Sequence, residues 1–354
     1  MKSTSIVNPL KAFIERIPKA ELHLHLEGGA MYPATALELA KRNNMQMPFH
    51  DEASAEAFYR FNGLDQFIEI LRTTVATLNT AADYQTATEV IGAAAAQQNI
   101  WYHELFFTFG LVSPRGVSWQ IIIEGITEGR RVNRERYGVD TRFIADIDRT
   151  QEPQKGVEMV ELVAACSAEA GIVGIGMDCQ ESGFPAGRHK PAFELAKELG
   201  MNRVAHAGED GGPESIWDAI HNLDVQRIDH GVQAIEDPKL VRYLAEHQIP
   251  LTVCPVSNIE LKVFPDLASH SLLALMDAGC MLTINSDDPP MFDTDMTHDL
   301  FAITEAYGFG PEQIETFARN SFEATFMPGD EKAQCLSRFD AEVAALKQEL
   351  FGTN

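Results

Sequence analysis

The sequence is short of positive charge. Its 354 residues include 28 Lys and Arg against 52 Asp and Glu, which gives a formal net charge of −24. A chain this acidic repels the phosphate backbone of DNA or RNA at long range, and it repels anionic membrane surfaces in the same way. Nucleic acid and membrane lipid are therefore excluded as expected partners, whereas a small, weakly charged molecule or a cation is not.

Cysteines and long apolar runs are also scarce. The five cysteines are Cys166, Cys179, Cys254, Cys280 and Cys335. They form no Cys-x-x-Cys pair, which excludes a disulfide framework and a thiolate zinc knuckle and fits a reducing compartment. No window of about 18 apolar residues is free of charge, and the first ten residues lack the apolar run of a signal peptide. We therefore expect a cytoplasmic protein without a membrane span.

Low-complexity linkers and short repeats are absent as well, so we expect a single domain over residues 1–354. What recurs is a short run of β-type composition followed by a helical stretch. The runs cover residues 20–26, 100–107, 141–147, 172–177, 203–206, 226–230, 250–253 and 281–284. The clearest helical stretches cover residues 84–98, 119–137, 153–170, 191–199, 214–223, 238–246 and 271–278.

The alternation of strands and helices predicts a parallel sheet, and eight such units predict closure into a (β/α)8 TIM barrel. An open doubly wound sheet is the alternative, but no Gly-rich dinucleotide motif supports it. The residues beyond the roughly 250 of a typical barrel fall mainly in 32–83 and in 311–354. We expect a helical insertion after strand 1 at 32–83, which is a candidate lid over the active-site face, and a C-terminal helical extension at 311–354.

The first predicted strand carries two histidines. It reads Glu-Leu-His-Leu-His-Leu-Glu from residue 21, so the period of two puts His23 and His25 on one face and the leucines on the other. Two imidazoles spaced in this way can bind one metal ion, and Zn²⁺ suits them. Two half-buried histidines without a metal are the alternative. The position at a strand end, before Gly28 and Gly29, favours the metal.

Further polar residues stand at other strand ends. The fifth run ends at His206 with Glu209 three residues later, the sixth ends at His230, and the eighth is followed by Asp287 and Asp288. Taken singly, Glu209 could cap a helix and the Asp pair could form a turn. Because the carboxyl ends of barrel strands meet on one face, we expect these residues to lie together. A carboxylate there that is not a ligand can transfer protons.

The other seven histidines fall in helices, loops or mid-strand, and we assign them no metal role. They are His50, His103, His189, His221, His247, His270 and His298.

Five motifs together resemble the adenosine/adenine deaminase family of the amidohydrolase superfamily. They are His23-Leu-His25-Leu-Glu-Gly, His206-Ala-Gly-Glu209, Arg227-Ile-Asp-His230-Gly, Cys254-Pro-Val-Ser-Asn258 and Asn285-Ser-Asp287-Asp288-Pro, and the resemblance runs from about residue 17 to residue 324. It implies a (β/α)8 barrel enzyme with one Zn²⁺ per subunit that hydrolyses a 6-aminopurine to the 6-oxopurine and ammonia in purine metabolism.

The resemblance also implies a role for each motif residue. His23, His25, His206 and Asp287 would be the zinc ligands. Glu209 would protonate the purine nitrogen N1, His230 would orient or deprotonate the zinc-bound water, and Asp288 would hydrogen-bond N7. Zinc lowers the pKa of a bound water to about 7 and so supplies a nucleophile at neutral pH. Glu209 can donate a proton only if it is protonated on binding, which predicts a raised pKa in a closed pocket.

The substrate-binding residues depart from the adenosine pattern. Glu27 stands where adenosine deaminases carry an Asp that meets the ribose 5′-hydroxyl, and Glu181 stands near their Gly beside N3, close to Asp178. Glu27, Asp178 and Glu181 are therefore expected substrate contacts that look more like the adenine deaminase branch. Residues 212–217 and 289–292 look more like branches that act on nucleosides. Acidic residues in this pocket would also disfavour a nucleotide.

These features favour adenine or a small N6-substituted adenine as substrate, with adenosine or a larger adenosine derivative as alternatives. Two other classes stay open: a hydrolase of a non-purine amide or ester, and a non-catalytic binding protein. The sequence decides neither the oligomeric state nor the choice of zinc over iron or manganese.

Overall fold

The computed structural model describes residues 8–112 and 115–352. Eight parallel strands follow one another around a single sheet in chain order. They are β1 (Lys19–His25), β2 (Ile100–Thr108), β3 (Asp140–Asp148), β4 (Ile172–Asp178), β5 (Asn202–Ala207), β6 (Arg227–His230), β7 (Leu251–Val253) and β8 (Leu282–Ile284). Each lies within two residues of its predicted run.

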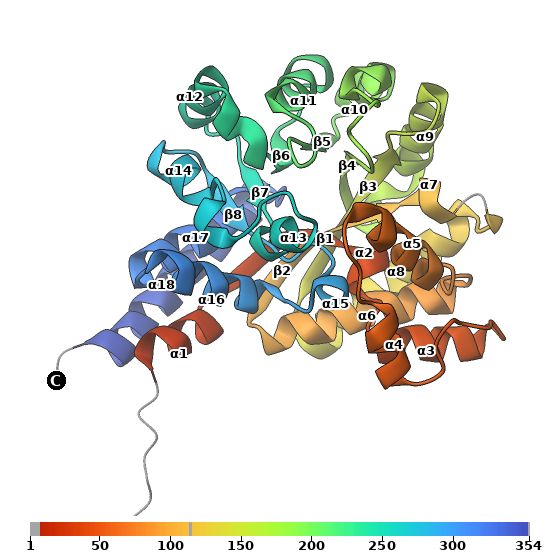
Figure 1. The fold of residues 1–354 in the computed structure, drawn as a ribbon, viewed down its shortest axis with the longest axis horizontal. Helices are drawn as coiled ribbons and strands as arrows, with labels where there is room; N and C mark the ends of the chain where they lie inside the picture. The colour runs from red at the N-terminus through yellow and green to blue at the C-terminus, as the bar shows by residue number, and fades with distance from the viewer. Residues whose placement is uncertain (1–7, 113–114, 353–354) are drawn as a thin grey trace, which may run out of the picture.

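The last strand meets the first. The backbone N–H of Asp287 donates to the carbonyl of His23 at 3.1 Å, and the N–H of His25 donates to the carbonyl of Asp287 at 3.0 Å. These hydrogen bonds join the segment after β8 to β1 and close the sheet. The predicted (β/α)8 barrel is therefore confirmed (Figure 1).

The α-helices surround the strands of the barrel (Figure 1). They are α1 (Pro9–Arg16), α2 (Leu26–Gly29), α3 (Pro33–Arg42), α4 (Glu52–Phe58), α5 (Leu64–Val75), α6 (Ala81–Gln97), α7 (Phe109–Val112), α8 (Trp119–Val132), α9 (Pro153–Ala170), α10 (Lys190–Glu198), α11 (Pro213–Asp218), α12 (Pro238–His247), α13 (Pro255–Glu260), α14 (Leu272–Asp277), α15 (Pro289–Phe292), α16 (Met296–Tyr307), α17 (Pro311–Glu323) and α18 (Gly329–Phe351). Many begin with proline at the first turn, where the missing N–H costs no hydrogen bond.

Two predicted helices change their winding before they end. The helix predicted over 119–137 is α-helical only to Val132 and finishes as a π-helical turn at Asn133–Tyr137. The one predicted over 214–223 is α-helical to Asp218 and π-helical over Ala219–Leu223. Each turn is followed by a residue in the left-handed region, Gly138 and Asp224, which ends the helix before the next strand.

The predicted insertion at 32–83 contains α3, α4 and α5 and the first residues of α6. Tyr59 ties it to the barrel, because its hydroxyl donates to the carbonyl of Met31 at 2.7 Å. Phe67 of α5 stacks on Phe292 of α15 with 5.2 Å between ring centroids. The insertion therefore packs on the face of the barrel where β8 ends.

The described part of the predicted C-terminal extension, residues 311–352, contains α17 and α18. Helix α18 lies beside α1 (Figure 1), where Phe13 packs edge-on against Phe351 and Arg16 pairs with Glu349 at 2.6 Å.

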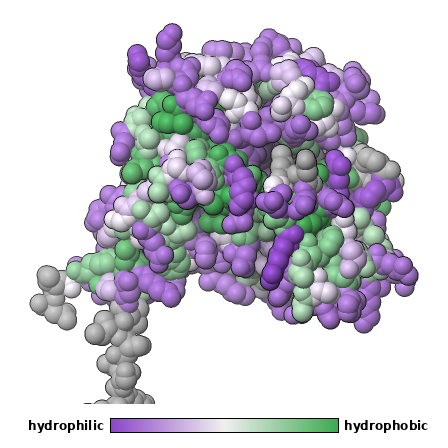
Figure 2. All heavy atoms as spheres, viewed as in Figure 1, coloured by the Kyte–Doolittle hydropathy of each residue, from purple (hydrophilic) through white to green (hydrophobic). Residues whose placement is uncertain are grey.

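The outward faces of α9 to α12 carry mainly hydrophilic side chains (Figure 2), while their inward faces hold buried residues such as Val160, Phe193 and Leu244. In the part of the chain that the structure describes, no helix combines the length and apolar character that a membrane span requires.

Candidate active site and metal centre

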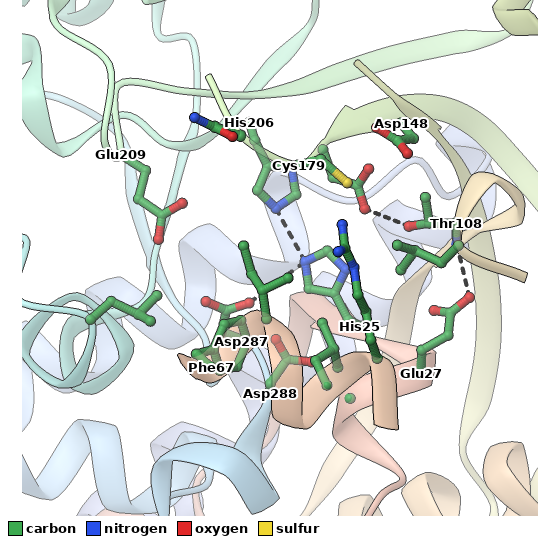
Figure 3. Close-up of a pocket in the computed structure, with 18 of the residues that line it drawn as sticks. His25, Glu27, Phe67, Thr108, Asp148, Cys179, His206, Glu209, Asp287 and Asp288 are labelled. Carbon is green, nitrogen blue, oxygen red and sulfur yellow. Dashed lines mark hydrogen bonds and ion pairs between the residues drawn. The ribbon is translucent and has the colours of Figure 1, made fainter. Parts of the chain in front are cut away.

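A cavity opens at the carboxyl ends of the strands (Figure 3). The strand ends and the loops after them supply its polar lining: His25, Glu27, Thr108, Asp148, Asp178, His206, Glu209, His230, Asp287 and Asp288. Helix α5 of the insertion supplies Phe67, Ile68 and Leu71, so apolar side chains cover one side of the same cavity. The predicted convergence of strand-end residues is therefore what the barrel produces.

Three imidazoles and one carboxylate meet at the base of the cavity. Nε2 of His25 lies 3.1 Å from Nε2 of His206. Oδ1 of Asp287 lies 3.7 Å from Nε2 of His23 and 3.6 Å from Nε2 of His25. The nitrogens of the three histidines fall within 4.8 Å of one another. The four residues predicted as ligands thus surround one point.

Hydrogen bonds orient two of these histidines so that each could bind a metal ion. Nδ1 of His206 lies 3.1 Å from the carbonyl of Met177, which can only accept, so Nδ1 carries the proton. The hydroxyl of Thr252 donates to Asp229 at 2.9 Å and must accept from Nδ1 of His23, also at 2.9 Å. The Nε2 atoms of both rings therefore present lone pairs to the centre, as zinc-binding histidines do.

The donor set fits Zn²⁺. Nε2 of His23 is buried and has no hydrogen-bond partner among the described residues. Burial lowers the pKa of His25 to about 3 and the pKa values of His23 and His206 well below their usual range, so all three rings are neutral. Oδ2 of Asp287 accepts from the hydroxyl of Ser257 at 2.6 Å, which leaves Oδ1 for a cation. Three neutral imidazoles and a carboxylate suit zinc in a tetrahedral site.

Asp287 and His230 both adopt a left-handed backbone, with φ of 65° and 64°. Such a conformation is uncommon for a residue other than glycine. At Asp287 it follows from the pairing of its backbone with β1, which turns the side chain toward the histidines.

Glu209 is the carboxyl group best placed to donate a proton. It lies on the loop after β5, and its Oε2 is 3.6 Å from Nε2 of His230 (Figure 3 shows Glu209 facing the cavity). Burial raises its pKa to about 8, and the nearby charges of Glu181 and Asp210 act in the same direction. The raised pKa expected from the sequence is therefore present, and Glu209 is protonated at neutral pH.

Asp288 lies close to the backbone of α2. A Cβ on Gly28 would stand 1.7 Å from Oδ1 of Asp288, so glycine is required there for the carboxyl group to reach the cavity. Burial raises the pKa of Asp288 well above its usual range, and Asp287 and Glu27 add to the effect. Within the described residues Oδ1 of Asp288 has no hydrogen-bond partner.

Thr108 at the end of β2 joins two of the predicted substrate contacts. Its N–H donates to Oε1 of Glu27 at 2.9 Å, and its hydroxyl donates to Oδ2 of Asp178. Oε2 of Glu27 and Oδ1 of Asp178 are buried, and neither finds a hydrogen-bond partner in residues 8–112 and 115–352. Burial raises the pKa of each carboxyl group to about 7. One oxygen of each residue is therefore left for a ligand.

Glu181 occupies a different position from the one expected. It is absent from the described residues that line the cavity. Its Oε1 accepts backbone N–H groups from Glu209 at 2.8 Å, Asp210 at 3.2 Å and Gly211 at 3.3 Å. Its Oε2 accepts the N–H of Gly208 at 2.9 Å and the hydroxyl of Ser215. Both oxygens are thus used within the protein, and the structure gives Glu181 the role of holding the loop of Glu209 instead of contacting a substrate.

Several residues of the site carried no recognisable sequence signal. Thr108, Thr252 and the apolar residues of α5 belong to ordinary strand and helix patterns, and only their tertiary contacts reveal them. Arg149, which lies 3.7 Å from Glu181, is a further example. Asn258 belongs to the motif Cys254-Pro-Val-Ser-Asn258, but the motif does not reveal the hydrogen-bond partners of its side chain.

Comparison with known proteins identifies the family of this chain. A family model described as adenosine deaminase matches residues 18–342. An adenine deaminase from Hahella chejuensis is 38% identical over 331 residues, which cover 94% of this chain and 98% of that protein. The crystal structure of an adenine deaminase from Arthrobacter aurescens has a TM-score of 0.88 at 32% identity, covering 93% of this chain and 99% of that one.

An amidohydrolase from Burkholderia ambifaria, crystallised with bound Zn, also has a TM-score of 0.88, at 26% identity over 99% of this chain and 97% of that one. The family match, the relatives and the barrel lead to the same assignment. The chain belongs to the adenosine deaminase family and is a hydrolytic deaminase of the amidohydrolase type.

Proposed function

We propose that this enzyme converts free adenine and water to hypoxanthine and ammonia, as a step in purine salvage or catabolism. One observation carries the proposal. Glu27 and Asp178 line the cavity beside Thr108, and each has one buried carboxyl oxygen without a hydrogen-bond partner among the described residues. A free purine base presents N9–H and N3 on one edge, which need an acceptor and a donor. Two carboxyl groups with pKa values of about 7 supply both. A nucleoside has no N9–H.

The names of the relatives support the free base. The proteins similar to this chain at 35–39% identity that we compared are adenine deaminases, and the chain covers nearly their full length. The net charge of −24 would oppose the approach of a substrate phosphate, which disfavours nucleotides.

His23, His25, His206 and Asp287 would hold the catalytic metal, and Zn²⁺ suits them best. When bound, zinc would activate a water molecule as the nucleophile at neutral pH. Attack of the water oxygen at C6 moves electrons to N1, and the protonated Glu209 donates its proton there. A protonated Asp288 donates to N7 and orients the ring. The attacking water supplies both protons that complete the reaction: one restores the proton of Glu209, and the other goes to the C6 amino group, which leaves as ammonia. The 6-oxopurine is then formed.

The test is a steady-state comparison of adenine with adenosine, using zinc-loaded protein and following ultraviolet absorbance and ammonia release. We expect kcat/KM for adenine to exceed that for adenosine by roughly 10²-fold or more, because the ribose leaves buried polar groups unpaired. Equal or better turnover of adenosine would overturn the choice of substrate, and no turnover of either would overturn the proposed function.

A small N6-substituted adenine is a second candidate. Phe67, Ile68 and Leu71 of α5, together with Leu111 and Leu261, give the cavity an apolar side that could receive an alkyl group. N6-methyladenine belongs in the same kinetic comparison, with release of methylamine as the diagnostic product.

A further inference from the structure

Two buried side chains connect His230 to the backbone of α14. His230, Asn258 and His270 are almost completely shielded from solvent. Nδ2 of Asn258 lies 3.3 Å from Nδ1 of His230, and Oδ1 of Asn258 lies 3.2 Å from Nε2 of His270. At the far end, the backbone N–H of Leu272 donates to Nδ1 of His270 at 2.9 Å. Asn258 and His270 thus each have one hydrogen-bond partner on either side.

The backbone N–H at the end of this chain decides the direction of every hydrogen bond in it. A backbone N–H can only donate, so Nδ1 of His270 accepts and the neutral ring carries its proton on Nε2. Burial lowers the pKa of His270 to about 4, which keeps the ring neutral. Nε2–H of His270 then donates to Oδ1 of Asn258, and the amide nitrogen faces His230. Nδ1 of His230 is therefore an acceptor.

The opposite orientation of the Asn258 side-chain amide is excluded by the same hydrogen bonds. It would place the NH2 of Asn258 against Nε2–H of His270, so two donors would face each other in a buried site. A buried donor left without an acceptor is strongly unfavourable, so this orientation is excluded. The neutral His230 ring consequently carries its proton on Nε2, the nitrogen that lies 3.6 Å from Oε2 of Glu209 and 4.0 Å from Oδ2 of Asp287.

We propose that Asn258 and His270 are positioning residues that fix the tautomer of His230, and that this tautomer decides between the two roles that the family resemblance allows His230: its Nε2–H orients the attacking oxygen as a hydrogen-bond donor. In this form Nε2 has no lone pair, so the proton of the attacking water passes to the carboxylate of Glu209, which has given its own proton to N1, and not to His230. The catalytic part of the inference rests on the proposed function, whereas the tautomer itself does not.

The tautomer can be measured without turnover. Zinc-loaded protein labelled with ¹⁵N-histidine would be studied by ¹⁵N–¹H correlation spectroscopy at neutral pH, and the His230 signals would be assigned by their loss in His230→Gln. We expect a protonated Nε2 and an unprotonated Nδ1. A proton on Nδ1, or on both nitrogens, overturns the inference even if adenine is deaminated. Failure of adenine turnover with the expected tautomer sinks only the proposed function and the catalytic part.

Asn258→Asp tests the positioning role. The carboxylate can only accept, so it draws the proton of His230 to Nδ1 and leaves a lone pair on Nε2. We expect kcat to fall roughly 10²–10⁴-fold with zinc retained, since a wrong imidazole tautomer costs about 10⁴-fold in serine proteases. His103→Gln is the control, because His103 is a buried histidine of β2 outside this chain and should leave the His230 signals unchanged.

Two results with Asn258→Asp overturn the proposal: an unchanged tautomer removes the positioning role of Asn258, and a switched tautomer with normal kcat removes the donor role of His230. If the variant does not fold, the measurement on the unaltered protein still decides the tautomer.

Discussion

The carboxylate of Glu181 accepts the backbone N–H of Glu209 at 2.8 Å, and its second oxygen accepts the N–H of Gly208 at 2.9 Å. A buried acid thereby holds the loop that carries the proposed proton donor. Its charge persists although burial opposes it, because Arg149, Ser215 and the loop N–H groups lower its pKa. That same charge contributes to the raised pKa of Glu209.

Glu181→Gln should lower activity and shift its pH dependence. Gln has one acceptor oxygen in place of two, so part of the loop loses its hydrogen bonds, and a misplaced Glu209 should cost roughly 10–100-fold in kcat. Removing the negative charge also lowers the pKa of Glu209 from about 8. Glu209 then loses its proton at a lower pH, so the alkaline fall of kcat/KM for adenine should begin at a lower pH.

Asp83→Asn is a matched control for that variant. Asp83 is also buried, accepts backbone N–H groups from Asn79 and Thr80, and pairs with Arg42 at 3.1 Å, but it lies at the start of α6, away from the cavity lining. Its pH profile should match the unaltered enzyme. An unshifted alkaline limb in Glu181→Gln would contradict the electrostatic role of Glu181.

Glu209→Gln should reduce kcat by roughly 10²–10⁴-fold, the usual contribution of general acid–base catalysis, while zinc content stays normal. In the unaltered enzyme kcat/KM should fall as pH rises through about 8, because Glu209 must be protonated. A hydrolase of a simple amide or ester would need no proton at a purine N1. Substantial activity in Glu209→Gln would therefore favour that class.

Alanine substitutions of the adjacent residues Asp287 and Asp288 should differ in their effect on zinc binding. Asp287→Ala removes the carboxylate that faces His23 and His25, so both zinc and activity should be lost. Asp288→Ala should keep zinc and lose rate, because Asp288 is not among the proposed ligands. Metal analysis by mass spectrometry and steady-state kinetics on the two variants check this. Retained zinc in the first or a normal rate in the second would refute the assigned roles.

Glu27→Asp should weaken the preference for the free base. The shorter side chain withdraws the carboxyl group that Thr108 now holds at 2.9 Å and leaves room beside N9. We expect kcat/KM for adenine to fall roughly tenfold to a hundredfold, with that for adenosine unchanged or increased. A ratio of the two values equal to that of the unaltered enzyme would argue against Glu27 as the N9 contact.

A bound purine should protect the insertion at residues 32–83 from proteolysis. Phe67, Ile68 and Leu71 line the cavity from α5, so a bound purine adds apolar contacts to this helix. Limited proteolysis with and without a purine inhibitor should show slower cleavage within residues 32–83 when the inhibitor is bound. Equal cleavage rates would speak against a lid.

Local patterns in the sequence determined the barrel and the core of the site. The period of two placed His23 and His25 on one face, and the eight strand runs placed His206, His230 and Asp287 at ends that a closed barrel must bring together. These are properties of single strands and of their number, so no knowledge of distant contacts was needed. The family motifs then added a role for each residue.

Only the tertiary structure decided which hydrogen bonds the polar residues of the site make. Glu181 is a residue of the same strand end as Asp178, yet five hydrogen bonds from residues 208–215 turn it into a support for Glu209. The tautomer of His230 likewise depends on Asn258, His270 and the backbone of Leu272. Hydrogen bonds form between groups that folding brings together from distant positions, and sequence periodicity contains no record of that pairing. The residue types were therefore set locally, but their donor and acceptor roles were set by the fold.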